Sequence, residues 1–485
     1  MSERLSLATL DRASAGTARP SVDPRALELG IVHLGLGAFH RAHQAMITED
    51  AMAAAGDASW GIAGTSQRSR DVVEQLRPQD GLYTVLEKSP AGSSTRIVGS
   101  IREALHAADD HARIRSLLSD PRIRVVSLTI TEKGYLLGPD RGLDLDAPGV
   151  REDVATLRAG ADVPMRTAVG LLAQGLLARD GAPVTVMPCD NMASNGGTLA
   201  SVLGAMLGAA GRDPAIGGVG FAGTVVDRIV PITGDAGRAE VERAIGLRDE
   251  GAVLGEPFWQ WVIEDSFVAG RPAWDRVGAT MADDVEPFEM LKLRILNSTH
   301  SLLAYLGALA GFRTIPECVD LPEFDAAAWR LAGEAIPALE LPEGVDAAEY
   351  TRSVMERYRN RALGHQTLQV AMDGSQKLPL RIVPTALAAL RRGDEPVAAA
   401  LTAAAWMVFV ARGRTVGGAE LPLDDPLAER LRSAAAGAES GLADRMLAVR
   451  EVFPAELAEH PRWRELVGEA VARFGSDEPR AWATF

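Results

Sequence analysis

GIVHLGLGAFHRAHQ, residues 30–44, is the first segment of the chain that indicates a fold. An apolar run, the pair Gly35 and Gly37, and a helix-like continuation together predict a strand, a tight turn and a helix start. Glycines at such a turn let the backbone approach a pyrophosphate at the helix N-terminus. Because His40 replaces the third glycine of the usual Gly-x-Gly-x-x-Gly pattern, the pattern alone is equally consistent with a plain turn.

Further strand-like segments follow, and polar residues stand where they end. Residues 60–65 predict a second strand, and the apolar run within 123–135 ends at Glu132 and Lys133. Asn191 lies just past another strand-like segment, APVTVMP. In a doubly wound sheet, ligands bind at the carboxyl ends of the strands. We therefore predict an α/β domain, Rossmann-like, whose ligand-binding residues lie along one edge of its sheet.

The residues after the second predicted strand bear on the choice of cofactor. In NAD-selective enzymes an acidic group at this place binds the ribose hydroxyls. Here the chain carries Arg70 and Asp71, with Arg68 close by. Asp71 could bind the hydroxyls, Arg68 or Arg70 could accept a 2′-phosphate, or the arginines could be plain surface charges. We predict NAD as the cofactor and leave NADP or dual use open.

A change of pattern near residue 284 divides the chain. Strand-like alternation gives way to helical periodicity that continues to the C-terminus. We predict a Rossmann-like NAD-binding domain at 1–283 and an all-helical substrate and catalytic domain at 284–485, with the active site in the cleft between them. A chain of 485 residues is long enough for two such cores.

PFEMLKLRILNSTHSLLAYLGALAGF, residues 287–312, predicts one long buried helix. At about 100° per residue, Glu289, Lys292, Asn297 and His300 fall within an arc of roughly 140°. A buried helix that presents four polar side chains in one direction is costly unless they meet partners or a substrate. The alternative is a solvated polar stripe on an amphipathic helix.

Composition excludes several classes of function. Hydrophobic and charged residues make up 47% and 24% of the chain, as in soluble globular proteins, and no apolar run reaches the roughly 18 residues of a membrane span. The net charge of −15 argues against nucleic acid as a partner. No signal-peptide core is present at the N-terminus, so we expect a cytoplasmic protein that acts on a small molecule, as a monomer or a homodimer.

KLRILNSTHSLLAYLG resembles the catalytic helix of the polyol-specific long-chain dehydrogenases, a family that includes mannitol 2-dehydrogenases and fructuronate reductases (D-mannonate oxidoreductases). GLGAFHRAHQA and the EPF–QWVIED segment are similar to the same family, so the resemblance covers nearly the whole chain. It implies that Lys292 is the catalytic base, that Asn297 and His300 contact the reacting oxygen, and that Asn191 pairs with Asn297 to bind it. Glu289 would either relay the proton to water or form an ion pair with Lys292.

The resemblance also implies residues that bind the cofactor and the substrate. The expected cofactor contacts are Gly35, Gly37, Phe39, Arg70, Asp71 and Glu132, and the expected substrate contacts are Lys133, Asp227, His365 and Lys377.

Several motifs favour one branch of this family. TEKGY, KLR, GHQTLQ and GSQKLPLR resemble the fructuronate reductases, and Gln369 stands where mannitol 2-dehydrogenases place a substrate-binding arginine. We therefore predict interconversion of D-mannonate and D-fructuronate. The alternative is a polyol and ketose couple such as D-mannitol and D-fructose, and a remote one is a non-catalytic dinucleotide-binding protein.

Two other dehydrogenase mechanisms fit the sequence poorly. A catalytic zinc site needs a group of cysteine, histidine or carboxylate ligands, whereas Cys189 and Cys318 lie far apart without a local cluster. Short-chain dehydrogenases need Tyr-x-x-x-Lys, and no tyrosine of the chain has a lysine four residues later. We predict a reaction that uses a lysine base and no metal.

Overall fold

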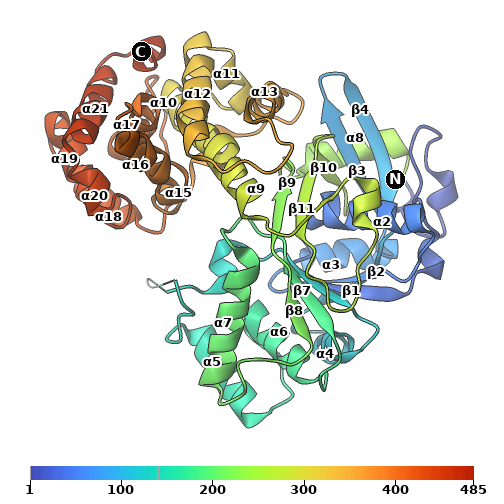
Figure 1. The fold of residues 1–485 in the computed structure, drawn as a ribbon. Helices are drawn as coiled ribbons and strands as arrows, with labels where there is room; N and C mark the ends of the chain where they lie inside the picture. Colours follow the sequence, from blue (N-terminus) through green and yellow to red (C-terminus); the bar gives the residue numbers. More distant parts are fainter. Residues whose placement is uncertain (1, 139–140, 485) are drawn as a thin grey trace. The chain divides into compact units, whose positions relative to one another are not determined.

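The computed structural model describes residues 2–138 and 141–484. Its internal contacts divide the chain into two units, Met1–Glu286 and Pro287–Phe485. Each unit has its own hydrophobic core. Figure 1 shows both units.

The first unit contains a six-stranded sheet in which every neighbouring pair of strands is parallel. Its spatial order is β5-β2-β1-β6-β7-β8, which corresponds to 3-2-1-4-5-6 in the order of the chain. This is the order of the Rossmann fold, and its direction reverses between β1 and β6. The strands are β1 (Leu29–Leu34), β2 (Gly61–Ser66), β5 (Ile101–His106), β6 (Val125–Leu128), β7 (Val184–Pro188) and β8 (Val219–Phe221).

Helices cover both faces of this sheet, which explains why its central strands are almost wholly buried. Val32 and Leu34 of β1 pack in one core with α4, α5, α6 and α7, whereas Ile31 packs in another core with α2. Alternate residues of a strand point to opposite faces, so one strand supplies both cores. The helices are α2 (Gln44–Ala55), α4 (His111–Ser119), α5 (Pro148–Ala159), α6 (Ala168–Leu177) and α7 (Asn195–Ala209).

Two small sheets complete the first unit. One has the order β10-β3-β4 and the other the order β12-β11-β9. Their strands are β3 (Tyr83–Ser89), β4 (Gly92–Val98), β10 (Val253–Gly255), β9 (Thr224–Asp227), β11 (Gln260–Glu264) and β12 (Thr280–Ala282). Shorter helical pieces connect these parts: α1 (Ala38–Ala42), α3 (Asp71–Leu76), α8 (Asp235–Ile245), and 3₁₀ turns at Leu10–Arg12, Pro24–Ala26, Arg77–Gln79, Glu132–Tyr135 and Trp274–Val277.

The second unit is helical, and none of its described residues belongs to a sheet strand. Helix α10 (Ser298–Ala310) lies at its centre with residues buried on all sides, and α17 (Val397–Arg412) packs against it. Alanines on α17 allow close helix contact, and almost the whole of α17 is buried. The helices from α11 onward are α11 (Ile315–Val319), α12 (Pro322–Ala335), α13 (Ala347–Tyr358), α14 (Thr367–Ala371), α15 (Gly374–Arg381), α16 (Val383–Arg392), α17 (Val397–Arg412), α18 (Ala428–Ala435), α19 (Leu442–Leu447), α20 (Ala455–Ala458), α21 (Pro461–Arg473) and α22 (Pro479–Trp482), with 3₁₀ turns at Ile336–Ala338 and Glu439–Gly441.

The predicted Rossmann-like α/β part and the predicted helical part are both confirmed. That the first binds NAD and the second carries the catalytic base stays a prediction. Within the residues that the structure describes, no helix has both the length and the apolar character needed to cross a membrane.

The prediction of one continuous α-helix over residues 287–312 is wrong in its middle. The structure has α9 at Glu286–Leu291, a π-helix at Lys292–Asn297, and α10 at Ser298–Ala310. In a π-helix the backbone hydrogen bonds join residues five apart instead of four. The helical-wheel angles expected for an α-helix therefore do not apply across this segment.

Candidate active site

Gly35 lies at the point where the order of the large sheet reverses. Its backbone has φ +116°, and a Cβ added there would lie 2.1 Å from the carbonyl oxygen of Thr129. The Thr129 hydroxyl donates a hydrogen bond to the Gly35 carbonyl at 2.7 Å. The fold itself therefore requires glycine at this position, because a side chain would clash with Thr129 where the turn after β1 meets the loop after β6.

Gly37 is different, because the packing of the protein does not require a glycine there. Its backbone is extended, it caps the N-terminus of α1, and a Cβ added to it would meet nothing closer than the Gly35 carbonyl oxygen at 3.8 Å. Bare backbone at this edge of a Rossmann sheet fits the close approach of a pyrophosphate. The predicted cofactor residue Phe39 is half-buried nearby, with its ring stacked on His43 at 5.1 Å.

His40, which stands in place of the third glycine, packs onto the strand below it. Its ring stacks on His33 of β1 with centroids 3.4 Å apart. His33 is held by Ser127 of β6, with 2.8 Å between Nδ1 and the hydroxyl oxygen. Burial lowers the pKa of His33 to about 3 and that of His40 well below its usual value. These imidazoles are therefore neutral packing groups, and the helix above them is interrupted at His43 between α1 and α2.

The residues after β2 show how Arg70 is engaged. Its guanidinium donates two hydrogen bonds of 2.7 Å to the carboxylate of Asp109, which follows β5 on the neighbouring side of the sheet. The Arg70 guanidinium holds the pKa of the Asp109 carboxyl below its usual range. Asp71 is exposed in the first turn of α3. The ionised carboxylate of Asp109 therefore lies against Arg70. The sequence alone did not indicate this partner.

Asp190 joins the loops that follow β6 and β7. Its carboxylate accepts a hydrogen bond from the Tyr135 hydroxyl at 2.7 Å and another from the backbone of Ile130. Burial raises the pKa of Asp190 to about 7, against the opposing effect of the Tyr135 hydrogen bond. Glu132 and Lys133 lie in the exposed 3₁₀ turn that ends at Tyr135.

Asn191 follows Asp190 directly and is exposed, and its role as a ligand of the reacting oxygen stays a prediction. The side chain of Asn195 holds this loop, because its amide donates to the carbonyl oxygens of Asp190 and Thr224 at 3.1 and 2.8 Å. Thr224 begins β9, and the predicted substrate residue Asp227 lies buried at the end of that strand. Asn195 thereby connects the strand that carries Asp227 to the loop that carries Asn191.

The helical segment at residues 286–310 keeps its predicted polar residues buried. Glu289, Lys292, Asn297 and His300 are each less than 10% exposed. Glu289 and Lys292 are three residues apart, as are Asn297 and His300, and that spacing shares one face of an α-helix. Lys292 and Asn297 are five residues apart, which is the hydrogen-bond spacing of the π-helix that they begin and end. The π-helix therefore lets all four residues follow one face.

His300 lies among aromatic and basic side chains of its own unit. Its ring stacks on Tyr358 with centroids 5.1 Å apart and meets the edge of His365 at 4.7 Å. Burial lowers the pKa of His300 well below its usual value, and the positive charges of Arg381, Lys377 and Arg357 and the neighbouring His365 lower it further. His300 is therefore neutral. Among the described residues its buried Nε2 has no hydrogen-bond partner.

The predicted substrate residues His365 and Lys377 are thus brought close to His300. Burial, followed by the charge of Arg357, lowers the pKa of His365 to about 4. The Lys377 ammonium donates to the carbonyl oxygen of Val370 at 3.1 Å. Gln369, on which the predicted choice of branch partly rests, is exposed on α14. Arg357 and Arg381 are basic neighbours of His300 that the sequence reading did not single out.

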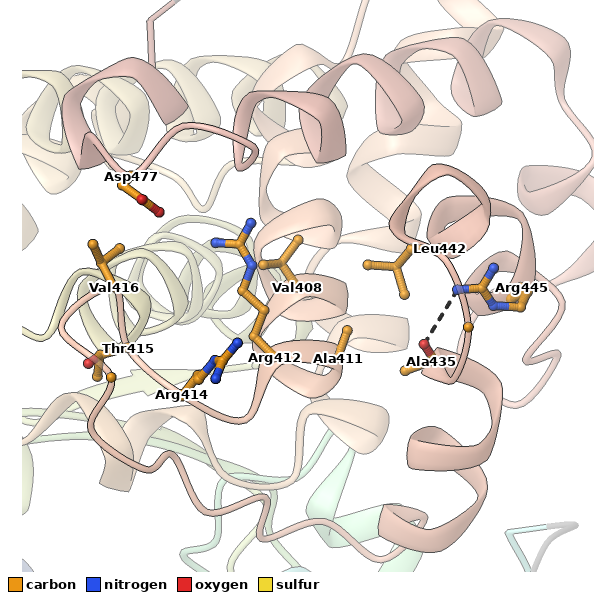
Figure 2. A pocket seen from close by; sticks show the side chains of 12 residues that line it. Val408, Ala411, Arg412, Arg414, Thr415, Val416, Ala435, Leu442, Arg445 and Asp477 are labelled. Carbon is orange, nitrogen blue, oxygen red and sulfur yellow. Dashed lines mark hydrogen bonds between the residues drawn. The ribbon is translucent and has the colours of Figure 1, made fainter.

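A cavity of about 610 Å³ lies in the second unit (Figure 2). One of its lining residues is Val416, whose backbone N–H donates to the Leu309 carbonyl. Leu309 is roughly 25 Å along the helix from Lys292, so this wall of the cavity is far from the predicted base. Two of its arginines stabilise helix ends: Arg412 donates to the Phe474 carbonyl, and Arg445 donates to the Ala435 carbonyl. None of the predicted site residues lines this cavity.

Among the residues that the structure describes, no three His, Cys, Asp or Glu side chains are grouped so that they could hold a metal ion. Cys189 and Cys318 are buried free thiols. Burial raises the pKa of both.

Comparison with known proteins finds matches over both units. The sequence family described as Mannitol dehydrogenase Rossmann domain matches residues 29–276, and that described as Mannitol dehydrogenase C-terminal domain matches residues 284–474. The chain belongs to the mannitol dehydrogenase family. The family's members are oxidoreductases, and the predicted resemblance is confirmed.

Relatives within the mannitol dehydrogenase family match almost the full length of the chain. The chain is 40% identical over 476 residues to the uncharacterized oxidoreductase YeiQ of Escherichia coli, covering 95% of both chains. It is 39% identical over 483 residues to the D-mannonate oxidoreductase of Escherichia coli, covering 96% of this chain and 97% of that one. The Pseudomonas fluorescens mannitol 2-dehydrogenase in ternary complex with NAD and D-mannitol is 32% identical, with a TM-score of 0.88 and coverage of 99% and 98%.

Proposed function

We propose that this protein is an NAD-dependent oxidoreductase that interconverts D-mannonate and D-fructuronate. Two relatives support the reaction type: one is a D-mannonate oxidoreductase, and the other is a mannitol 2-dehydrogenase complexed with NAD and D-mannitol. NAD, when bound, accepts the hydride of the secondary alcohol. The glycine turn at Gly35 and Gly37 and the sheet edge beside it are the parts of the chain that would hold the cofactor.

Lys292 takes the hydroxyl proton in this proposal. A positioned general base contributes about 10²–10⁴-fold to a rate. Asn191 and Asn297 donate amide hydrogens to the oxygen that gains negative charge, and each such donor is worth on the order of 10²–10³-fold. His300 is neutral, so it acts as a donor to the same oxygen. Glu289, one turn before Lys292, relays the proton to water.

The observation that carries the choice of an acid substrate is the group of basic side chains around His300. Lys377, Arg381 and Arg357 each act on the pKa of His300 through their charge, so all three lie near the proposed reacting oxygen. Lys133, in the first unit, is a further candidate. A carboxylate complements this charge, whereas D-mannitol has none to offer. The net charge of −15 does not oppose an anionic substrate, because the local field governs binding.

NAD is favoured over NADP by the Arg70 pair. A 2′-phosphate would need the guanidinium that already binds the Asp109 carboxylate at 2.7 Å. It would also lie close to that negative charge, which opposes a dianion. Asp71 is exposed beside this pair and is the proposed partner of the ribose hydroxyls.

A substrate panel tests the proposal. Initial rates are measured for reduction of D-fructuronate, other hexuronates, D-fructose and other ketoses, each with NADH and with NADPH. We expect kcat/KM to be highest for D-fructuronate with NADH. Equal or faster reduction of D-fructose would replace the proposed substrate with a neutral polyol couple, and binding of NADH without turnover of any substrate would favour a non-catalytic role.

The rest of the proposal rests on the sequence. The protein acts without a metal ion, in the cytoplasm, on a small molecule, as a monomer or a homodimer. Activity that disappears on treatment with a chelator and returns with zinc would contradict the first point.

A further inference from the structure

The carbonyl groups of the π-helix receive hydrogen bonds from an unusual number of side chains. Changing from bonds between residues four apart to bonds between residues five apart interrupts the regular ladder, so carbonyl oxygens at the transition need other donors. Three local hydroxyls supply some of them. Ser298 donates to Arg294, Thr299 donates to Ile295 at 2.7 Å, and Ser301 donates to Asn297 at 3.1 Å.

Two further donors come from other helices. The Tyr358 hydroxyl, at the end of α13, donates to the Leu296 carbonyl at 2.6 Å and lies 3.0 Å from the Thr299 hydroxyl. The Arg381 guanidinium, at the end of α15, donates to the Asn297 carbonyl at 3.2 Å and to the Ser301 hydroxyl at 3.0 Å. The last two carbonyls of the π-helix, those of Leu296 and Asn297, are therefore each held from outside the helix.

These bonds favour the π form over a continuous α-helix. A return of residues 292–297 to α geometry would rotate and shift the carbonyls of Leu296 and Asn297 relative to the helices that supply these two donors. A one-residue change of register would also turn Lys292 by about 100° relative to Asn297 and His300. The segment is buried, so a hydrogen bond lost in such a change is costly, and the two bonds therefore favour the register in which Tyr358 and Arg381 reach these carbonyls.

We propose that Tyr358 and Arg381 are positioning residues that maintain the π-helix and so keep Lys292 on the same face as Asn297 and His300. The inference rests on the proposed function for its catalytic consequence, but its structural part does not depend on the substrate. Tyr358 has a second contact with the same set, because its ring stacks on His300.

The structural part is tested by a crystal structure of the double variant Y358F/R381K. We expect residues 292–297 to rewind toward α geometry and the Lys292 side chain to leave the face shared with Asn297. A π-helix unchanged in this variant overturns the proposal, whatever the enzyme's substrate proves to be.

The catalytic part is tested on whichever substrate of the panel the wild type reduces fastest. Tyr358→Phe keeps the ring stacked on His300 and removes only the donor. We expect kcat to fall by at least about tenfold, the pH profile of kcat to shift, and the affinity for NADH to stay within twofold. An unchanged kcat and pH profile overturns the proposal, as does a loss of thermal stability with no change in the profile.

Matched variants separate positioning from other effects. Tyr305→Phe removes the hydroxyl of another buried tyrosine, on α10 itself, whose oxygen has no hydrogen-bond partner among the described residues; we expect it to retain wild-type kcat. Arg381→Lys keeps the positive charge but loses the planar guanidinium that reaches both acceptors. A positioning role predicts that its kcat falls while the KM for the acid substrate stays within a few fold. A raised KM at wild-type kcat would show that the guanidinium binds the substrate, and unchanged kcat and KM would show that Arg381 supplies charge alone; either result would overturn its part of the proposal.

Discussion

The Tyr135 hydroxyl lies 2.7 Å from the buried carboxylate of Asp190 and donates a hydrogen bond to it. This contact links the loop after β6 to the loop after β7, one residue before the proposed oxyanion ligand Asn191. Its energy depends on pH, because the pKa of Asp190 is raised to about 7 by burial.

Protonation of Asp190 therefore stabilises the fold, and the first prediction concerns this dependence. The folded pKa of about 7 lies above the ordinary value for an aspartate, about 3.9, so the contribution is complete below about pH 4 and is lost as the pH rises through about 7. At 1.36 kcal/mol per pKa unit, the loss reaches up to about 4 kcal/mol. Asp190→Asn mimics the neutral carboxyl, so its stability relative to wild type should increase between pH 4 and pH 8.

Urea unfolding of both proteins across this pH range measures the effect. Tyr135→Phe is the companion variant, because it removes the hydrogen bond that lowers the pKa of Asp190. The pKa of Asp190 should then rise, and the loss of stability should extend to higher pH. A difference between wild type and D190N that is constant with pH would show that Asp190 does not titrate in this range.

Gly37→Ala tests the cofactor turn. The added Cβ has room within the protein, so thermal stability should stay within a few degrees of wild type, while the affinity for NADH falls at least about tenfold because the methyl group occupies the approach of the pyrophosphate. Gly35→Ala is the contrasting variant, since its Cβ would lie 2.1 Å from a carbonyl oxygen, and it should destabilise the fold itself. Wild-type NADH affinity in G37A, measured by fluorescence titration, would exclude the turn as the pyrophosphate site.

Lys292→Ala should lower kcat by about 10²–10⁴-fold, because it removes the proposed base. NADH binding should persist, and added primary amines should restore part of the rate by replacing the missing amine. Steady-state kinetics with and without amine measure both effects. Unchanged turnover would remove Lys292 from the base role and leave the proton transfer to another group.

Asp109→Asn should alter the choice of cofactor. The change removes the carboxylate that binds Arg70 and leaves the guanidinium available to a 2′-phosphate. We expect the ratio of kcat/KM for NADPH to that for NADH to rise severalfold, and the additional change Arg70→Met to cancel the gain. A ratio that does not respond to either change would place the 2′ position elsewhere.

Local patterns were enough to predict the fold class. The apolar runs and the glycine turn at residues 30–44 are properties of neighbouring residues, and the structure confirms the parallel sheet and the helical second part. The same local evidence identified the buried polar residues of the proposed catalytic helix, because Lys292 and Asn297 interrupt an apolar sequence.

The details that the sequence did not reveal depend on distant residues. Periodicity assumes one helical repeat throughout, so it could not show the π-helix, whose carbonyls are held by Tyr358 and Arg381 from positions 62 and 84 residues away from the acceptors. The raised pKa of Asp190 comes from burial, and its hydrogen-bond donor Tyr135 lies 55 residues earlier in the chain. The run of hydroxyls Ser298, Thr299 and Ser301 inside an apolar helix was the one local signal, because such residues often bond to helix carbonyls.

The five-residue interval between Lys292 and Asn297 has a practical meaning for protein engineering. A designer who transplants this lysine, asparagine and histidine onto an idealised α-helical scaffold would place the lysine and the asparagine about 140° apart around the helix. A working copy needs the widened turn as well as the residues, and it needs a tyrosine and an arginine on adjacent helices to keep that turn from relaxing.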